Sequence, residues 1–233
     1  MASNRLQLNT TKTEVLWCSS GRRRHQLPSA TFRVGSDYIE PAAVVRDLGI
    51  YIDSDVNMRC QVSHTVSRCF GVLRQLRTIR RSVTESVFQS LVVMLVLPVL
   101  DYRNATLAGA LSHRLRRLQS LMNTAARLIF RASRCDHVTP LLRRLHWLHV
   151  PERVSFKLAT LTFRCLHGLA PAYLSSDIHR VADAPSRRRL RSSSTAALAV
   201  PRTRCTRKQS FFRCCTTSLM LLHRRHFPRL NLN

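Results

Sequence analysis

The stretch RDLGIYIDSDVNMRCQV, from Arg46 to Val62, marks the change from a β pattern to a helical pattern in this chain. Before it, residues 13–18 and 43–52 are rich in the β-branched and aromatic residues that strands prefer. After Asp55, apolar residues recur every three or four positions, which is the period of one helix face. The stretch therefore predicts a mainly α protein with a short β element at the N-terminus.

Two aspartates in this stretch, Asp53 and Asp55, allow two interpretations. In an extended strand, residues two apart point to the same face, and carboxylates on one face can hold the metal ions that drive nucleotidyl transfer. Alternatively, the strand ends here and an aspartate caps the helix that follows. We favour the second interpretation, with Asp55 as the N-cap residue.

Five helices are predicted downstream. The first has its apolar face at Val62, Val66, Cys69, Leu73 and Leu76. The others cover about 83–99, with a kink or an end near Pro98, about 113–131, a short segment after Asp136, and a segment from Pro151 to Gly168. The helix over 113–131 has an apolar stripe at Leu118, Leu121, Met122, Ala125 and Ile129. Its opposite face carries Arg116, Ser120, Asn123, Arg127 and Arg131.

The charge of the chain points to a polyanionic partner. The 233 residues carry a formal net charge of +26 and only three lysines, Lys12, Lys157 and Lys208. Arginine pairs bidentately with phosphate and stacks on bases, so RNA or DNA is the leading partner class and an acidic membrane surface is the second. Arg116 and Arg127 lack acidic partners three or four residues away, so a phosphate-contacting face is as well supported as a solvated one. The segments GRRRH and SRRRLRSSS are RNA-binding or nuclear-localisation candidates.

Metal binding and membrane insertion have weak support in the sequence. The eight cysteines form no Cys-x-x-Cys pair and no secretory signal opens the chain, so we expect reduced, buried thiols in a protein that is not secreted. His146 and His149 form a His-x-x-His pair, with Cys135 and His137 as distant candidates for a third ligand, but surface or capping roles are favoured. The longest apolar run, residues 91–100, is half the length of a membrane span.

Six blocks in order resemble the C-terminal part of a LINE-type non-LTR retrotransposon reverse transcriptase, of the jockey-like or chicken-repeat-like sort. The blocks are LNTTKTEVLW (8–17), VVRDLGIYID (44–53), HTVSRCFGVLRQLRTIRR (64–81), LDYRNATLAG (100–109), RLQSLMNTAARLIF (117–130) and DHVTPLLRRLHWLHVPERVSFKLATLTFRCLHGLAPAYL (136–174). The resemblance covers most of residues 1–204. It implies that 1–54 is a palm remnant and 55–180 a helical thumb and connection region. The segment 181–233 begins rich in Ser, Arg and Pro and shows no helical period, so we expect a basic, disordered tail there.

The resemblance also implies roles for single residues. Lys12 matches the lysine of the last palm motif, near the incoming nucleotide. Leu48 and Gly49 fall in the primer-grip strand, where glycine lets a nucleic-acid backbone come close. The thumb would hold a template–primer duplex, with Arg116, Arg127 and Arg131 as candidate phosphate contacts.

The departures from the family matter as much. The catalytic aspartates that hold Mg²⁺ in the intact enzyme belong to motifs that precede LNTTKTE, and no adjacent Asp-Asp occurs in this chain. Arg103 stands where the family usually has glycine, and the sequence after about Phe212 is typical of a frameshift. We therefore expect a truncated fragment without polymerase activity, metal site or small-molecule substrate.

The expected property of such a fragment is non-specific nucleic-acid binding in the nucleus or cytoplasm. Three alternatives stay open at this point. They are an unstable remnant that binds nothing, a domesticated metal-dependent enzyme that uses Asp53 and Asp55, and a basic amphipathic protein that binds a membrane or a partner.

Overall fold

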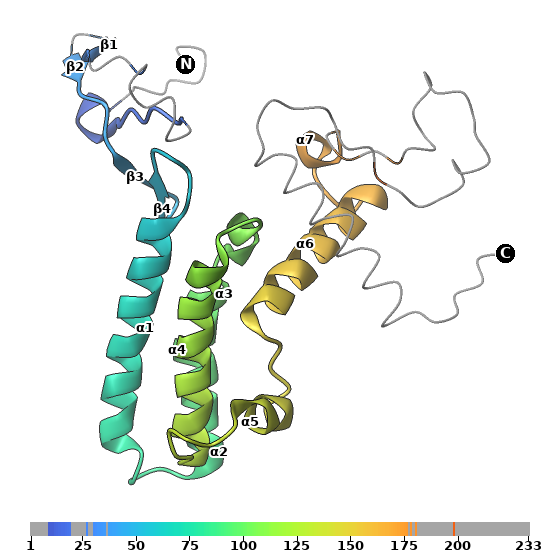
Figure 1. Cartoon of the computed structure of the whole chain (residues 1–233). Coiled ribbons are helices and arrows are strands. Elements are labelled where there is room, and N and C mark those ends of the chain that lie inside the picture. The colour runs from blue at the N-terminus through green and yellow to red at the C-terminus, as the bar shows by residue number, and fades with distance from the viewer. Residues whose placement is uncertain are drawn as a thin grey trace, which may run out of the picture.

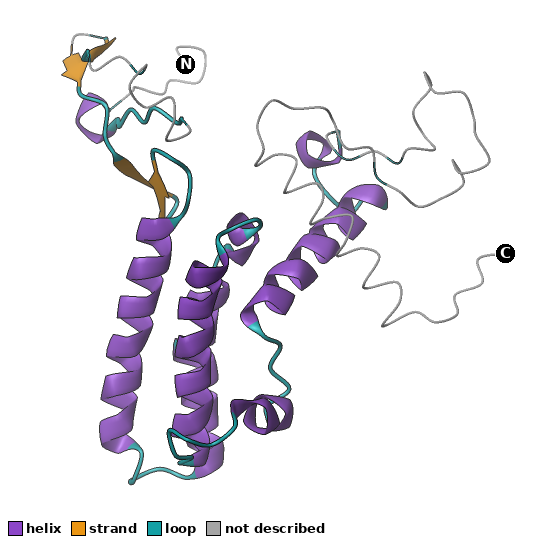
Figure 2. Ribbon diagram, viewed as in Figure 1, coloured by secondary structure: helices purple, strands orange, loops and turns teal. Residues whose placement is uncertain are grey.

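In a computed structural model of the chain, helices dominate and the strands lie at the N-terminal end (Figures 1 and 2). The structure describes residues 9–19, 27, 30–35, 37–176, 178, 180 and 198. The prediction of a mainly α chain with a short N-terminal β element is confirmed. Apart from Leu198, the predicted tail over 181–233, with the frameshift near Phe212, lies outside the described residues.

The N-terminal part contains a short 3-10 helix and two separate antiparallel hairpins. Strand β1 pairs with β2 and β3 pairs with β4. The predicted strand over 13–18 is wrong, because that segment forms only an isolated bridge between Val15 and Pro41. The elements are η2 (Thr10–Lys12), β1 (Phe32–Val34), β2 (Asp37–Ile39), β3 (Val44–Asp47) and β4 (Ile50–Asp53).

The helices follow the predicted order. Helix α2 ends at Leu95, and Pro98 lies in the first turn of α3. The predicted end of the helix near Pro98 is therefore confirmed. Pro151 likewise lies in the first turn of α6. The elements are α1 (Arg59–Ile79), α2 (Glu85–Leu95), α3 (Leu97–Asp101), η4 (Asn104–Leu107), α4 (Ser112–Phe130), α5 (Val138–Arg144), α6 (Val150–Leu166) and α7 (Ala172–Ser175).

Helix α4 is the centre of the bundle. It contacts α1, α2, α5 and α6, and α1 lies beside it along most of its length (Figure 1). Every residue of its predicted apolar stripe is at most 1% exposed. The predicted face of α1 is also confirmed, since Val62, Cys69, Leu73 and Leu76 are buried and Val66 packs against them. The two stripes meet and form the core.

A buried cation closes the end of the bundle where α1 and α4 both terminate. Arg80 is only 7% exposed, and its Nε and Nη2 donate to the carbonyls of Leu128 (3.1 Å) and Ile129 (2.6 Å). Those carbonyls belong to the last turn of α4, where the helix leaves them without partners and concentrates negative charge. The Arg80 guanidinium also lies 4.7 Å from the ring centroid of Phe88 on α2. This side chain therefore ties three helices together.

The expectation of buried thiols is confirmed for Cys69 and Cys165 and is wrong for three other described cysteines. Cys18 and Cys135 are exposed and Cys60 is half-buried, and all five thiols are free. Burial raises the pKa of the Cys69 thiol to about 11, which keeps it protonated at neutral pH. Among the described residues, no helix combines the length and the apolar character needed to cross a membrane.

Candidate nucleic-acid interface

The hairpin of β3 and β4 turns at Leu48 and Gly49, two residues that the family resemblance places in a single strand. Arg46 pairs with Tyr51 and Asp47 with Ile50, so Leu48 and Gly49 form a two-residue loop. Both have positive φ, 47° and 82°, as the turn that matches the twist of a hairpin requires. Leu48 and Gly49 therefore lie in a turn and not within the expected strand, and their role as a primer grip stays a prediction.

The Leu48–Gly49 turn is held by a tyrosine from the helical part. The hydroxyl of Tyr102 donates to the carbonyl of Leu48 (2.7 Å), and a Cβ placed on Gly49 would lie 3.6 Å from the Tyr102 ring. A left-handed leucine is uncommon, so this bond stabilises a turn that the local sequence does not favour. It also fixes the hairpin relative to the end of α3.

Asp53 makes the junction between the hairpin and α1. It is only 4% exposed, and both of its carboxylate oxygens accept the backbone N–H of Cys60 (3.3 Å each). That N–H is one of the unpaired donors in the first turn of α1. The pKa of the Cys60 thiol is raised, first by a hydrogen bond with the Asp53 carboxylate and then by burial.

The prediction that Asp55 is the N-cap residue is wrong. Helix α1 begins at Arg59, and its N-cap is Met58, which has a left-handed backbone conformation. The observed N-cap lies three residues after Asp55 in the sequence. The Asp55 carboxylate instead accepts the backbone and side-chain N–H groups of Asn57. The capping role passes to Asp53, which is the other aspartate of the pair.

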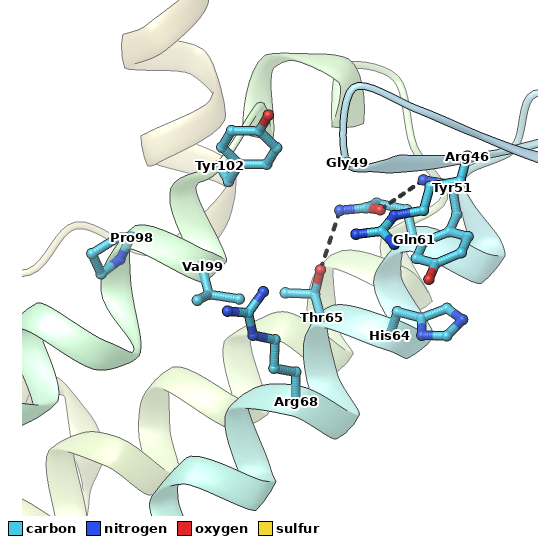
Figure 3. A pocket seen from close by; sticks show the side chains of 10 residues that line it. All are labelled: Arg46, Gly49, Tyr51, Gln61, His64, Thr65, Arg68, Pro98, Val99 and Tyr102. Carbon is cyan, nitrogen blue, oxygen red and sulfur yellow. Dashed lines mark hydrogen bonds between the residues drawn. The ribbon is translucent and has the colours of Figure 1, made fainter.

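An open cleft of about 420 Å³ lies between the hairpin, α1 and α3 (Figure 3). Its polar wall comes from β3, β4 and the first turns of α1, and Pro98, Val99 and Tyr102 form the other wall. The lining residues are Arg46, Gly49, Tyr51, Gln61, His64, Thr65, Arg68, Pro98, Val99 and Tyr102. No carboxylate lines the cleft, so its charge is entirely positive.

A chain of contacts fixes the polar wall. The backbone N–H of Tyr51 donates to Gln61 Oε1 (3.0 Å), and Gln61 Nε2 donates to Thr65 Oγ1 (3.3 Å). The Tyr51 ring stacks on His64 with centroids 4.0 Å apart and planes within 9°. Arg46 lies 5.6 Å from the Tyr51 centroid, and within the described residues Arg68 has no hydrogen-bond or ion-pair partner. Figure 3 shows Arg46 and Arg68 on the same side of the cleft.

The predicted site residues are spread over the molecule. Gly49 lines the cleft, whereas Lys12 lies in η2, exposed, and is not part of the lining. Arg116 is exposed in the second turn of α4. Arg127 and Arg131 are about 16 and 22 Å further along the helix axis, at 1.5 Å per residue. The structure therefore does not bring these residues together at one site.

Two of the predicted arginines contact the protein's own backbone. Arg127 donates to the carbonyl of Asp136 (3.1 Å), and Arg131 to that of Arg80 (3.4 Å). Their contact with nucleic acid stays a prediction. The histidine pair has a structural role at one position, since His149 is the N-cap of α6 and its N–H bonds to Glu152 (3.0 Å). In the described part of the chain, no cluster of three or more His, Cys, Asp or Glu residues is arranged to hold a metal.

Sequence reasoning missed Arg46, Tyr51, His64, Arg68 and Tyr102. A two-residue turn at Leu48–Gly49 would place Arg46 opposite Tyr51, but leucine is a poor residue for the positive φ of that turn, so the sequence does not indicate it. The spacing of four between His64 and Arg68 places them on one helix face. The position of Tyr102 depends on a contact between residues 54 apart, for which the sequence has no signal.

No family model, curated protein or solved structure matches this chain.

The backbone at Arg103 supports a prediction about stability. Arg103 has φ 50°, a left-handed conformation that costs an L-residue about 1–2 kcal/mol. We expect Arg103→Gly to be as stable as the parent or slightly more so. Arg103→Val should lower the free energy of unfolding by about 1–2 kcal/mol, because branching at Cβ disfavours this conformation further. Urea titration followed by circular dichroism measures both changes. A valine variant that is more stable than the glycine variant would contradict the assignment.

Proposed function

We propose that this chain is a segment of a LINE-type reverse transcriptase that binds RNA or DNA without sequence specificity and does not itself catalyse polymerisation. The observation that carries the proposal is the carboxylate-free cleft lined by Arg46, His64 and Arg68. Two guanidinium groups in a cleft without a carboxylate match the phosphates of a nucleic acid.

The helix beside the cleft supports the same partner. Helix α1 contains no acidic residue over its 21 residues, and Arg68, Arg74 and Arg77 are exposed on it. Gly71 lies in the middle of α1, where a Cβ would meet nothing within 4 Å. The missing side chain leaves the backbone of α1 accessible at this position.

Two of the blocks that resemble the family meet at the cleft. The block at 44–53 supplies the hairpin and the block at 100–109 supplies Tyr102, and the Tyr102–Leu48 hydrogen bond joins them. Arg103, where the family usually has glycine, has the positive φ that glycine adopts without strain. These contacts place the two blocks side by side in the fold. The assignment of palm and thumb rests on the resemblance itself.

The side chains of the cleft do not fit the Mg²⁺ that the intact family enzyme would use. Mg²⁺ takes oxygen ligands, usually one or two carboxylates with water and phosphate oxygens. The lining offers cations, rings and amide groups, and the nearby Asp53 carboxylate is buried and already accepts the Cys60 N–H. We therefore assign the cleft to binding and not to metal-assisted chemistry.

Salt-dependent binding tests the proposal. If about six phosphates are contacted, log affinity for a duplex should fall against log salt with a slope of about −5, a loss of about 10³ between 50 and 200 mM. Replacing both Arg46 and Arg68 by alanine should weaken binding at least tenfold and reduce the slope by about 2. Fluorescence anisotropy with a labelled duplex of about 20 base pairs measures both quantities, for RNA and DNA.

The control removes the same charge elsewhere. Arg81 follows the C-terminal end of α1 and Arg143 lies in α5, and both are exposed. Figure 1 shows the C-terminal end of α1 and helix α5 at the opposite end of the bundle from the β3–β4 hairpin. Their double alanine variant should retain affinity within about threefold. Equal losses in both double variants would show that binding follows net charge alone and would refute the cleft as the site. An affinity that barely changes with salt would refute phosphate binding altogether.

A further inference from the structure

Helix α6 exposes aromatic rings on the side that faces away from the core. Phe156 and Phe163 are 50% and 49% exposed. They are seven residues apart, so they lie on one face about 10 Å from each other along the axis. The ring of Phe163 contacts that of His167, with centroids 4.1 Å apart. The rings thus form a row along the outer face of α6.

A basic row runs beside the rings. Lys157 and Arg164 are exposed, seven residues apart, and have no hydrogen-bond or ion-pair partner within the described residues. Arg153, which precedes them in this row, forms a bidentate ion pair with Asp101. The single acidic residue of α6, Glu152, accepts the N–H of His149 at the helix start. The free charge beside the rings is therefore positive.

The exposed face of α6 is aromatic and not aliphatic. This composition favours nucleic-acid bases over an aliphatic protein surface as the partner of the face. Val154, Leu158 and Leu166 of α6 pack on the core, and Leu161 is half-buried. Phe156 and Phe163 are the large apolar side chains that the helix exposes. An aromatic face flanked by cations is the arrangement by which proteins stack the bases of a single strand and hold its phosphates. In a duplex the bases are already stacked on one another and are not available.

We propose that the outer face of α6 binds single-stranded nucleic acid by stacking bases on Phe156 and Phe163, while Lys157 and Arg164 contact phosphates. This inference rests on the proposed nucleic-acid binding and adds a second surface, distinct from the cleft, with a preference for single strands. Its residues belong to a different helix from those of the cleft, so each surface has its own variants.

The experiment compares a labelled (dT)20 strand with a 20-base-pair duplex by fluorescence anisotropy. The double variant Phe156→Leu/Phe163→Leu keeps apolar side chains but removes the rings. Base–aromatic stacking is worth about 1–3 kcal/mol per base, so the loss should be at least tenfold for (dT)20. Binding to the duplex should change less than twofold. The double variant Phe156→Trp/Phe163→Trp should retain the (dT)20 affinity, because the indole ring also stacks.

Controls separate stacking from folding and from self-association. Met94 and Leu95 are exposed apolar residues on α2, 73% and 46%, and their double alanine variant should bind (dT)20 like the parent. Circular dichroism establishes that each variant is folded. Unchanged (dT)20 affinity in the leucine variant would refute the inference. Sedimentation that shows a dimer in the parent and a monomer in the leucine variant would also refute it, since the rings would then join two copies.

The two proposals fail separately. If replacing Arg46 and Arg68 leaves duplex binding intact while the leucine variant loses (dT)20 binding, the cleft is wrong and the α6 surface stands. The opposite pattern refutes the α6 surface and keeps the cleft.

Discussion

Arg80→Ala is expected to lower the free energy of unfolding by about 3 kcal/mol, because it leaves two carbonyls at the end of α4 without their partner. The lost bonds are charge-assisted, at 3.1 and 2.6 Å, and each buried acceptor left unpaired costs about 1–3 kcal/mol. The favourable interaction of the cation with the C-terminus of α4 and with the Phe88 ring is lost as well. Denaturant unfolding followed by circular dichroism measures the change.

Two further variants make this result specific to the geometry. Arg80→Lys keeps the charge but replaces the planar guanidinium by an ammonium group. It should therefore lower the free energy of unfolding by roughly half as much as Arg80→Ala. The neighbouring Arg81 is exposed, and Arg81→Ala should change the free energy of unfolding by less than about 0.5 kcal/mol. If Arg80→Ala and Arg81→Ala cost the same, the buried contacts at the end of α4 contribute nothing and this account is wrong.

Leu121→Ala is the second substitution with a large expected effect. Leu121 is fully buried in the centre of α4, where the stripes of the bundle meet. Removing a buried leucine leaves a cavity and costs about 3–5 kcal/mol. Since single domains are stable by about 5–15 kcal/mol, this variant should be close to unfolding at 37 °C. Thermal and urea unfolding measure the loss.

The matched control uses the same substitution beside the same helix. Leu111 immediately precedes α4 and is 55% exposed. Leu111→Ala should therefore cost less than about 1 kcal/mol. A similar loss for both variants would mean that α4 is not the centre of the core.

The helical part of the fold could be predicted because its signals are local. The stripe on α4 repeats at the helical period, and each of its five members is at most 1% exposed. Pro98 and Pro151 mark helix boundaries for a reason intrinsic to proline, which lacks the N–H of the helix interior. In these segments the sequence pattern and the tertiary contacts favour the same structure.

The hairpin turn and the helix cap could not be predicted because distant groups decide them. Leu48 is a poor residue for positive φ, and Tyr102, 54 residues away, stabilises it there. Asp55 is nearer to the helix start in sequence, yet the direction of β4 places Asp53 under the Cys60 N–H. Sequence spacing does not distinguish the two aspartates. The path of β4 does, because it brings only Asp53 to the Cys60 N–H.

The candidate site was only partly accessible to sequence reasoning for the same reason. The excess of arginine predicts a polyanionic partner, but it does not show which arginines are free. Arg80 looks like one more surface cation in the sequence and proves to be buried, whereas Arg46 and Arg68 face an open cleft. The β3–β4 hairpin, α1 and α3 form the cleft, and only the tertiary fold brings all three together.

The Tyr102–Leu48 hydrogen bond makes the cleft depend on the whole fold. It joins residues 54 apart, so the hairpin by itself does not form the second wall. The cleft exists only where α3 is packed beside the hairpin. A nucleic acid that binds only the completed cleft would stabilise that packing by mass action, so the ligand itself would help to maintain the fold that recognises it.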